Sequence, residues 1–217
     1  MSLLLLVPAV AACGSSKKEA ATTRGATAPP TQAAGGCKRV AAPAPKGKGH
    51  EKKPKGELDD SKSWALAVQT NCGAFTIALD VKQSPHTTAS LVALAKSHFF
   101  DGTTFHRIAP GFVIQGGDPT GTGGGGPGYK TVDKPPADAE YVRGVVAMAK
   151  TEQEPDGTAG SQFFVVTGQQ TGLRPHYAVV GRVAAGLDVV ERIGQLGDQS
   201  EQPTQTVVIK TMRVEEG

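Results

Sequence analysis

The sequence of 217 residues has few aromatic side chains and few cysteines: one Trp, three Tyr, seven Phe and three Cys. It also lacks a long hydrophobic run, since the apolar stretch Leu3–Ala12 has only ten residues, too few to span a bilayer. Glycine and proline are abundant, with 28 and 15 residues. This composition favours a loop-rich β domain together with an unfolded segment.

The sequence shows no pattern typical of a metal site or of a catalytic nucleophile. Its five histidines stand at positions 50, 86, 98, 106 and 176, without the spacing of clustered metal ligands. No nucleophile stands out beside a candidate base. We therefore expect no metal and no other cofactor.

A basic surplus is absent from the part of the chain expected to fold. Residues 14–60 carry ten basic and five acidic residues, whereas the rest of the chain carries 13 and 15. A nucleic-acid-binding domain needs its basic face on the folded part. We therefore expect no nucleic-acid partner, and the Lys-rich run 46–55 is typical of a solvated linker.

The N-terminal segment is typical of a signal peptide with a lipoprotein processing site. The apolar run Leu3–Ala12 ends in small residues directly before Cys13, which resembles the bacterial site where a cysteine is lipidated. No Lys or Arg precedes the run, which is unusual for a signal peptide. The expectation is a signal segment over 1–13 and anchoring to the bacterial cell membrane, on its extracytoplasmic side, through lipidated Cys13; the alternative is an unprocessed apolar terminus.

The next segment, residues 14–60, is rich in Ala, Pro and Lys and has no apolar periodicity, so we expect a disordered tether. If Cys13 is acylated, Cys37 and Cys72 remain. Outside the cytoplasm a disulfide between them is allowed. The alternative is two unrelated thiols.

One folded domain is expected over 61–217. Alternating or continuous apolar residues predict strands over 64–70, 74–80, 104–108, 112–115, 144–149, 163–167, 178–183 and 206–214. The pair Ser84-Pro85 predicts the start of a helix, with Ser84 as its cap, and a second helix is expected over 186–193. This pattern does not choose between a barrel and a sandwich.

A glycine-rich run at 121–128, GTGGGGPG, formally satisfies a dinucleotide-binding pattern. Such a site needs a helix directly after the glycines, and Pro127-Gly128 follows instead. We expect a long, flexible loop there.

The most informative segment is FFDGTTFHRIAPGFVIQGGD, residues 99–118, with a turn at 109–111 between two strand-like pieces. Alternation predicts Phe105 and Arg107 on one strand face and His106 on the other. With GSQFFVVT at 160–167, this segment resembles the two signature blocks of the cyclophilins, the peptidyl-prolyl cis-trans isomerases. The resemblance covers roughly residues 64–217.

The resemblance implies a mainly β fold: a closed eight-stranded antiparallel β-barrel capped by two α-helices. It implies isomerisation of X-Pro bonds in proline-containing polypeptides. Together with the expected membrane anchor, this predicts an isomerase that assists the folding of extracytoplasmic proteins. We expect it to be a monomer. Arg107 is implied as the catalytic donor to the prolyl nitrogen. The implied substrate-binding residues are His106, Phe112, Val113, Gln115, Ala149, Lys150, Gln162, Phe164, Leu173 and Tyr177.

Four positions depart from the family's common pattern: Val113 replaces Met, Lys150 replaces Asn, Gly172 replaces Trp and Tyr177 replaces His. The last two bear on binding of the cyclic peptide drug that names the family. Two alternatives to an isomerase are a non-catalytic proline-peptide binding or chaperone module and a lipid-anchored structural protein. The apolar residues of the implied site are equally typical of plain core.

Overall fold

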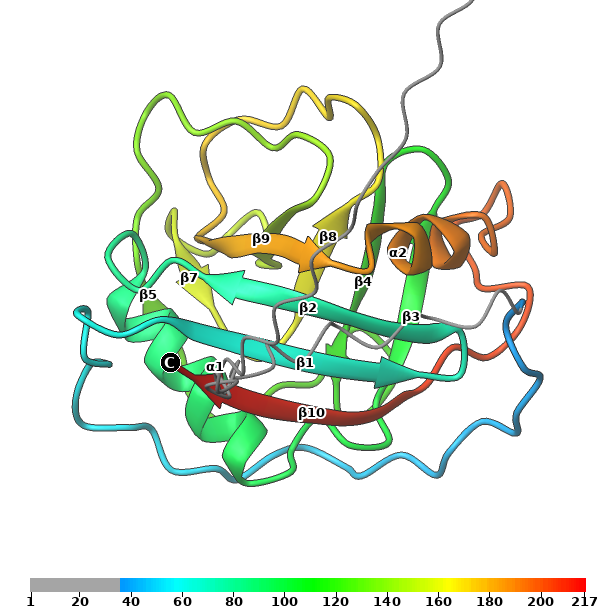
Figure 1. The fold of residues 1–217 in the computed structure, drawn as a ribbon, viewed down its shortest axis with the longest axis horizontal. Coiled ribbons are helices and arrows are strands. Elements are labelled where there is room, and N and C mark those ends of the chain that lie inside the picture. Colours follow the sequence, from blue (N-terminus) through cyan, green and yellow to red (C-terminus); the bar gives the residue numbers. More distant parts are fainter. Residues whose placement is uncertain (1–35) are drawn as a thin grey trace, which may run out of the picture. The chain divides into compact units, whose positions relative to one another are not determined.

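The computed structural model describes residues 36–217, which form ten strands and two helices (Figure 1). The predicted signal segment and Cys13 lie outside the described residues. The elements are β1 (Trp64–Thr70), β2 (Gly73–Leu79), α1 (Pro85–Lys96), β3 (Thr104–Ala109), β4 (Val113–Asp118), β5 (Thr131–Val132), β6 (Val145–Met148), β7 (Thr158–Ala159), β8 (Phe163–Val166), β9 (Val179–Ala185), α2 (Leu187–Gly194) and β10 (Ile209–Glu216). No helix among the described residues is long and apolar enough to cross a membrane.

Eight strands form one antiparallel sheet in the order β10-β1-β2-β9-β6-β8-β4-β3. The predicted closed barrel is wrong, because the edge strands β3 and β10 do not pair along their length. They meet through one isolated bridge, Thr104 with Val208, and through a few backbone hydrogen bonds near it. Since β10 becomes regular only at Ile209, the sheet stays an open, curled half-barrel.

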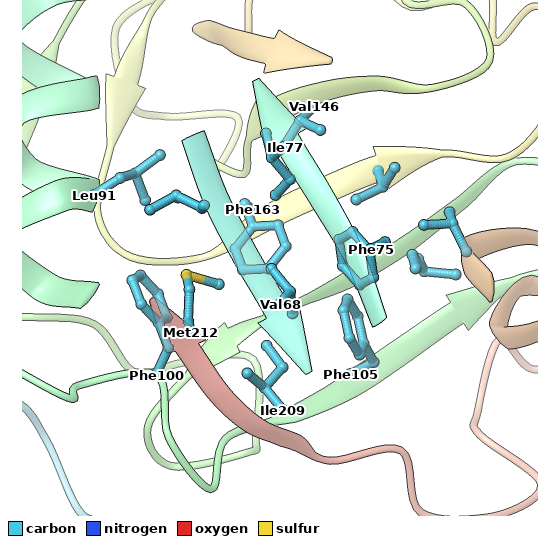
Figure 2. Close-up of a cluster of buried hydrophobic side chains, with 14 of the residues drawn as sticks. Val68, Phe75, Ile77, Leu91, Phe100, Phe105, Val146, Phe163, Ile209 and Met212 are labelled. Carbon is cyan, nitrogen blue, oxygen red and sulfur yellow. The ribbon is translucent and has the colours of Figure 1, made fainter. Parts of the chain in front are cut away.

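The inner face of this sheet encloses the main hydrophobic core (Figure 2). The β1–β2 hairpin was predicted from its alternating residues, and its inward side chains, among them Val68, Phe75 and Ile77, are almost fully buried. The short strands β5 and β7 form a separate pair that the sequence did not predict, because two residues are too few to show periodicity.

Helix α1 begins at Pro85 as predicted, but Ser84 does not cap it with its side chain. The Ser84 hydroxyl donates to the Val179 carbonyl at 2.6 Å instead. The N–H of Thr87, in the first turn of α1, donates to the carboxylate of Asp133 at 2.6 Å. A helix N-terminus favours a negative charge, so a distant acidic residue takes over the capping role.

Residues 36–60 differ from the disordered tether that the sequence predicted. They belong to the same compact unit as the domain and run along it as an extended strap. A disulfide joins Cys37 to Cys72. Backbone hydrogen bonds from Gly49 and Glu51 reach the carbonyls of Gly126 and Pro127, at 3.0 and 2.8 Å. Composition predicted disorder because the strap buries little apolar surface, but backbone pairing and a covalent bond hold it.

Candidate active site

A β-bulge in β3 sets the direction of the candidate catalytic side chain. Phe105 pairs with Gly116 and Arg107 pairs with Gln115, so His106 is an extra residue in the ladder. Phe105 therefore points into the core, and Arg107 lies on the opposite, outer face beside Gln115. The predicted sharing of one face by Phe105 and Arg107 is wrong, because the bulge breaks the alternation.

Arg107 is held in a chain of polar contacts on this outer face. Its Nη1 donates to Gln115 Oε1 at 3.3 Å, and Gln115 Nε2 donates to Gln162 Oε1 at 3.0 Å. Gln162 in turn donates to the carbonyls of Gly123 and Gly125, both at 2.9 Å. The guanidinium is thus held in one orientation by a chain of hydrogen bonds that extends to the glycine-rich loop.

A cavity of about 220 Å³, lined mostly by apolar residues, lies beside the guanidinium. Nine of the eleven residues implied by the resemblance line it: Arg107, Phe112, Val113, Gln115, Ala149, Lys150, Phe164, Leu173 and Tyr177. The Arg107 guanidinium carbon lies 5.8 Å from the centre of the Phe112 ring. The arrangement places a permanent cation with several N–H donors at the edge of an apolar pocket.

Two aromatic rings, Phe164 and Tyr177, form one wall of the cavity, and the buried ring of Tyr141 packs behind them. Phe164 and Tyr177 meet edge to face with centroids 5.5 Å apart, and Tyr141 packs against both. The Tyr141 hydroxyl donates to the Tyr177 carbonyl at 2.7 Å, and burial raises the pKa of Tyr141 to about 12. Tyr141 therefore stays a neutral donor that holds Tyr177. No local pattern indicates this role, because the contact joins residues 36 positions apart in the chain.

Two implied residues do not line the cavity. Gln162 reaches it only through its hydrogen bond to Gln115. The His106 ring is mostly buried and lies against Gly123. Burial lowers the pKa of His106, and the nearby carboxylate of Asp118 only partly opposes this effect, so the ring is neutral at neutral pH.

The glycine-rich loop is organised around Asp118 rather than around a phosphate. The carboxylate accepts hydrogen bonds from the backbone N–H groups of Thr120, Gly123 and Gly125, at 2.7, 2.6 and 3.1 Å. Burial raises the pKa of Asp118, but these hydrogen bonds outweigh it and leave the pKa below its usual value. The loop predicted to be flexible is thus tied to a fixed charge, which also supports the carbonyls that hold Gln162.

The sequence also missed the acidic partner of Arg107. Arg107 Nε donates to Glu201 Oε2 at 2.6 Å across 94 residues of chain, a separation that no local pattern reveals. Elsewhere in the part of the chain that the structure describes, no group of three or more His, Cys, Asp or Glu is arranged to hold a metal ion.

The curled eight-stranded sheet with its two helices is the fold of cyclophilins. The family described as cyclophilin type peptidyl-prolyl cis-trans isomerase/CLD matches residues 65–214, and the chain belongs to this family. The chain is 37% identical over 166 residues to peptidyl-prolyl cis-trans isomerase A of Mycobacterium tuberculosis, covering 68% of this chain and 90% of the relative. It is 34% identical over 154 residues to an Arabidopsis thaliana isomerase, covering 69% and 92%.

Solved structures of cyclophilin type isomerases resemble this chain in fold. A crystal structure of a Cryptosporidium parvum cyclophilin type isomerase, obtained in the presence of the dipeptide Ala-Pro, matches with a TM-score of 0.64. Its sequence is 31% identical, and the match covers 70% of this chain and 98% of that one. The match to the family begins at residue 65, after the strap.

Proposed function

We propose that this protein is a peptidyl-prolyl cis-trans isomerase in which Arg107 is the catalytic residue. The observation that carries the proposal is the fixed guanidinium at the edge of the apolar cavity, within a chain that belongs to the isomerase family. The substrate class is an extended polypeptide with an X-Pro bond. Its proline ring fills the pocket lined by Phe112, Val113 and Phe164.

The chemistry follows from the resistance of the peptide bond to rotation. Amide resonance sets a barrier of about 18–20 kcal/mol, and uncatalysed X-Pro exchange takes about 10–100 s. Rotation breaks the resonance and leaves a lone pair on the prolyl nitrogen. A charged N–H donor aimed at that lone pair stabilises the twisted state more than either planar state, which lowers the barrier without proton transfer.

The rest of the pocket holds the substrate while its preceding carbonyl rotates. The backbone at Ala149-Lys150 continues β6 and lines the cavity, so an extended peptide can pair with it. Gln115 and Gln162 bond the substrate backbone or hold Arg107. Tyr177 replaces the family's histidine as an aromatic wall.

The test is cis–trans exchange at an Ala-Pro peptide, measured by NMR exchange spectroscopy with wild type and Arg107→Ala side by side. We expect acceleration by wild type and its loss by about two orders of magnitude or more in the variant, as for removal of a preorganised electrostatic donor. Binding without acceleration by wild type would favour the non-catalytic peptide-binding module. Acceleration that survives the substitution would show that Arg107 is not the donor.

We also propose that the protein acts outside the cytoplasm, anchored by a lipidated Cys13, and assists the folding of extracytoplasmic proteins as a monomer. The Cys37–Cys72 disulfide supports the compartment, because disulfides persist in oxidising environments. The sequence before Cys13 supports the anchor. Mass spectrometry of the membrane-extracted protein should find a diacylglyceryl group on Cys13, and an unmodified Met1 on the mature protein contradicts the anchor.

A further inference from the structure

The guanidinium of Arg107 is fixed on two sides, and one of them is Glu201. Arg107 has five N–H donors; Nε–H bonds Glu201 and one Nη1–H bonds Gln115. Within the described residues the other three N–H bonds have no protein acceptor. These are the donors that remain for a substrate in the cavity.

We propose that Glu201 is a positioning residue for prolyl isomerisation: its carboxylate holds Arg107 so that the free donors face the prolyl nitrogen. This inference rests on the proposed function. An arginine side chain has several rotatable bonds, and a donor that is already in place loses less entropy when the twisted state forms. Glu201 touches no substrate in this scheme and acts only through Arg107.

The backbone of Glu201 supports a functional role. Its φ is +62°, in the left-handed region that Gly and Asn adopt more easily. The surrounding loop enforces this conformation: the Glu201 carbonyl accepts from Ile108 N at 2.9 Å, and its N–H donates to the Asp198 carbonyl at 3.0 Å. Strained residues of this kind gather at functional sites. A glycine would fit the backbone better but would leave Arg107 without its acceptor.

Stability does not explain the pair. The side chains of Arg107 and Glu201 are 32% and 44% exposed. Ion pairs with this much solvent exposure contribute little to folding stability, because water and salt screen them. The short contact between Nε and the carboxylate is therefore better explained by what it does to the direction of the guanidinium.

The decisive variant is Glu201→Gly, which relieves the backbone strain and removes the carboxylate. We expect an unchanged or higher melting temperature, an exchange rate of the bound Ala-Pro peptide reduced about tenfold, and an unchanged peptide affinity. Glu201→Gln keeps an acceptor for Nε and should stay within about threefold of wild type. Glu152→Gln is the matched control, because Glu152 is an exposed carboxylate two residues after the cavity residue Lys150 in the chain and is not the acceptor that Arg107 bonds.

A double variant separates positioning from a general effect of the loop. In an Arg107→Ala background, Glu201→Gly should cause no further loss of exchange. A loss of the same size in both backgrounds, or a Glu201→Gly protein that exchanges as fast as wild type, overturns the inference. If wild type itself gives no acceleration, the proposed function fails and this inference with it; an active wild type with an equally active Glu201→Gly overturns the inference alone.

Discussion

The two faces of strands β4, β6 and β8 have different roles. On β4, β6 and β8 the inward residues, such as Ile114, Met148 and Phe163, join the core inside the curled sheet. Their direct neighbours Val113 and Phe164 face outward into a second apolar cluster that lines the cavity. One face is sealed by the rest of the sheet, whereas the other is left open enough to receive a ligand.

The difference shows that apolar character alone does not separate core from site. Both clusters contain nearly fully buried aliphatic and aromatic residues, and Phe163 and Phe164 are 2% and 4% exposed. What separates them is the polar frame around the outer cluster, with Arg107, Gln115 and the ordered glycine-rich loop at its edge.

Removing a ring from the inner face should have the largest effect on folding. Phe163 packs edge to face against Phe100 and Phe105, at 6.1 and 6.0 Å between centroids. Phe163→Ala should lower the free energy of unfolding by about 3–5 kcal/mol, because it leaves a cavity that the sheet cannot close. Urea unfolding followed by circular dichroism measures the change. A loss below about 1 kcal/mol would mean that the inner core is not sealed.

The same substitution on the outer face provides the contrast. Phe112 is only partly buried and its ring lies next to the Arg107 guanidinium. Phe112→Ala should cost about 1 kcal/mol or less of stability, yet weaken Ala-Pro peptide binding about tenfold by removing one wall of the pocket. Equal effects of the two substitutions on stability would erase the distinction between the faces.

A smaller effect should come from the polar frame. Asp118→Asn removes the charge that the loop N–H groups bond, and should lower the free energy of unfolding by about 1–3 kcal/mol at neutral pH. Because the folded pKa of Asp118 is depressed, its contribution is present above the unfolded pKa of about 3.9 and is lost as the pH falls through the folded pKa.

The measurement is urea unfolding of wild type and Asp118→Asn between neutral pH and about pH 2, where the difference between the two should shrink. Asp138→Asn is the control, since Asp138 is exposed and has no hydrogen bond of this kind. A difference that stays constant down to the lowest pH would show that the charge of Asp118 does not hold the loop.

Local pattern predicted most of the elements, whereas the residues of the cavity came from the family resemblance. Alternation and turn residues were enough for β1, β2 and the start of α1, because these depend on near neighbours in the chain. The resemblance supplied nine of the cavity residues. The bulge at His106 was missed because alternation assumes an unbroken ladder.

The remaining errors share a physical cause, which is contact between distant segments. Asp133 bonds the N-terminus of α1 and Glu201 bonds Arg107, and neither carboxylate is near its partner in the sequence. The strap was misjudged because its composition cannot show that Cys37 is bonded to Cys72 or that Gly49 pairs with Gly126. Gly49 is needed there, since an added Cβ would lie 2.7 Å from the Gly126 carbonyl oxygen.

The carboxylate of Asp118 acts as a built-in ligand of the glycine-rich loop. Successive backbone N–H groups in such a loop form a concave site that attracts anions. Here the anion is part of the same chain, only a few residues away, so its effective concentration is on the order of millimolar or higher. A free phosphate or nucleotide would have to compete with it at every moment. The glycine-rich loop resembles a nucleotide-binding motif in sequence, but a carboxylate of the same chain already bonds its N–H groups.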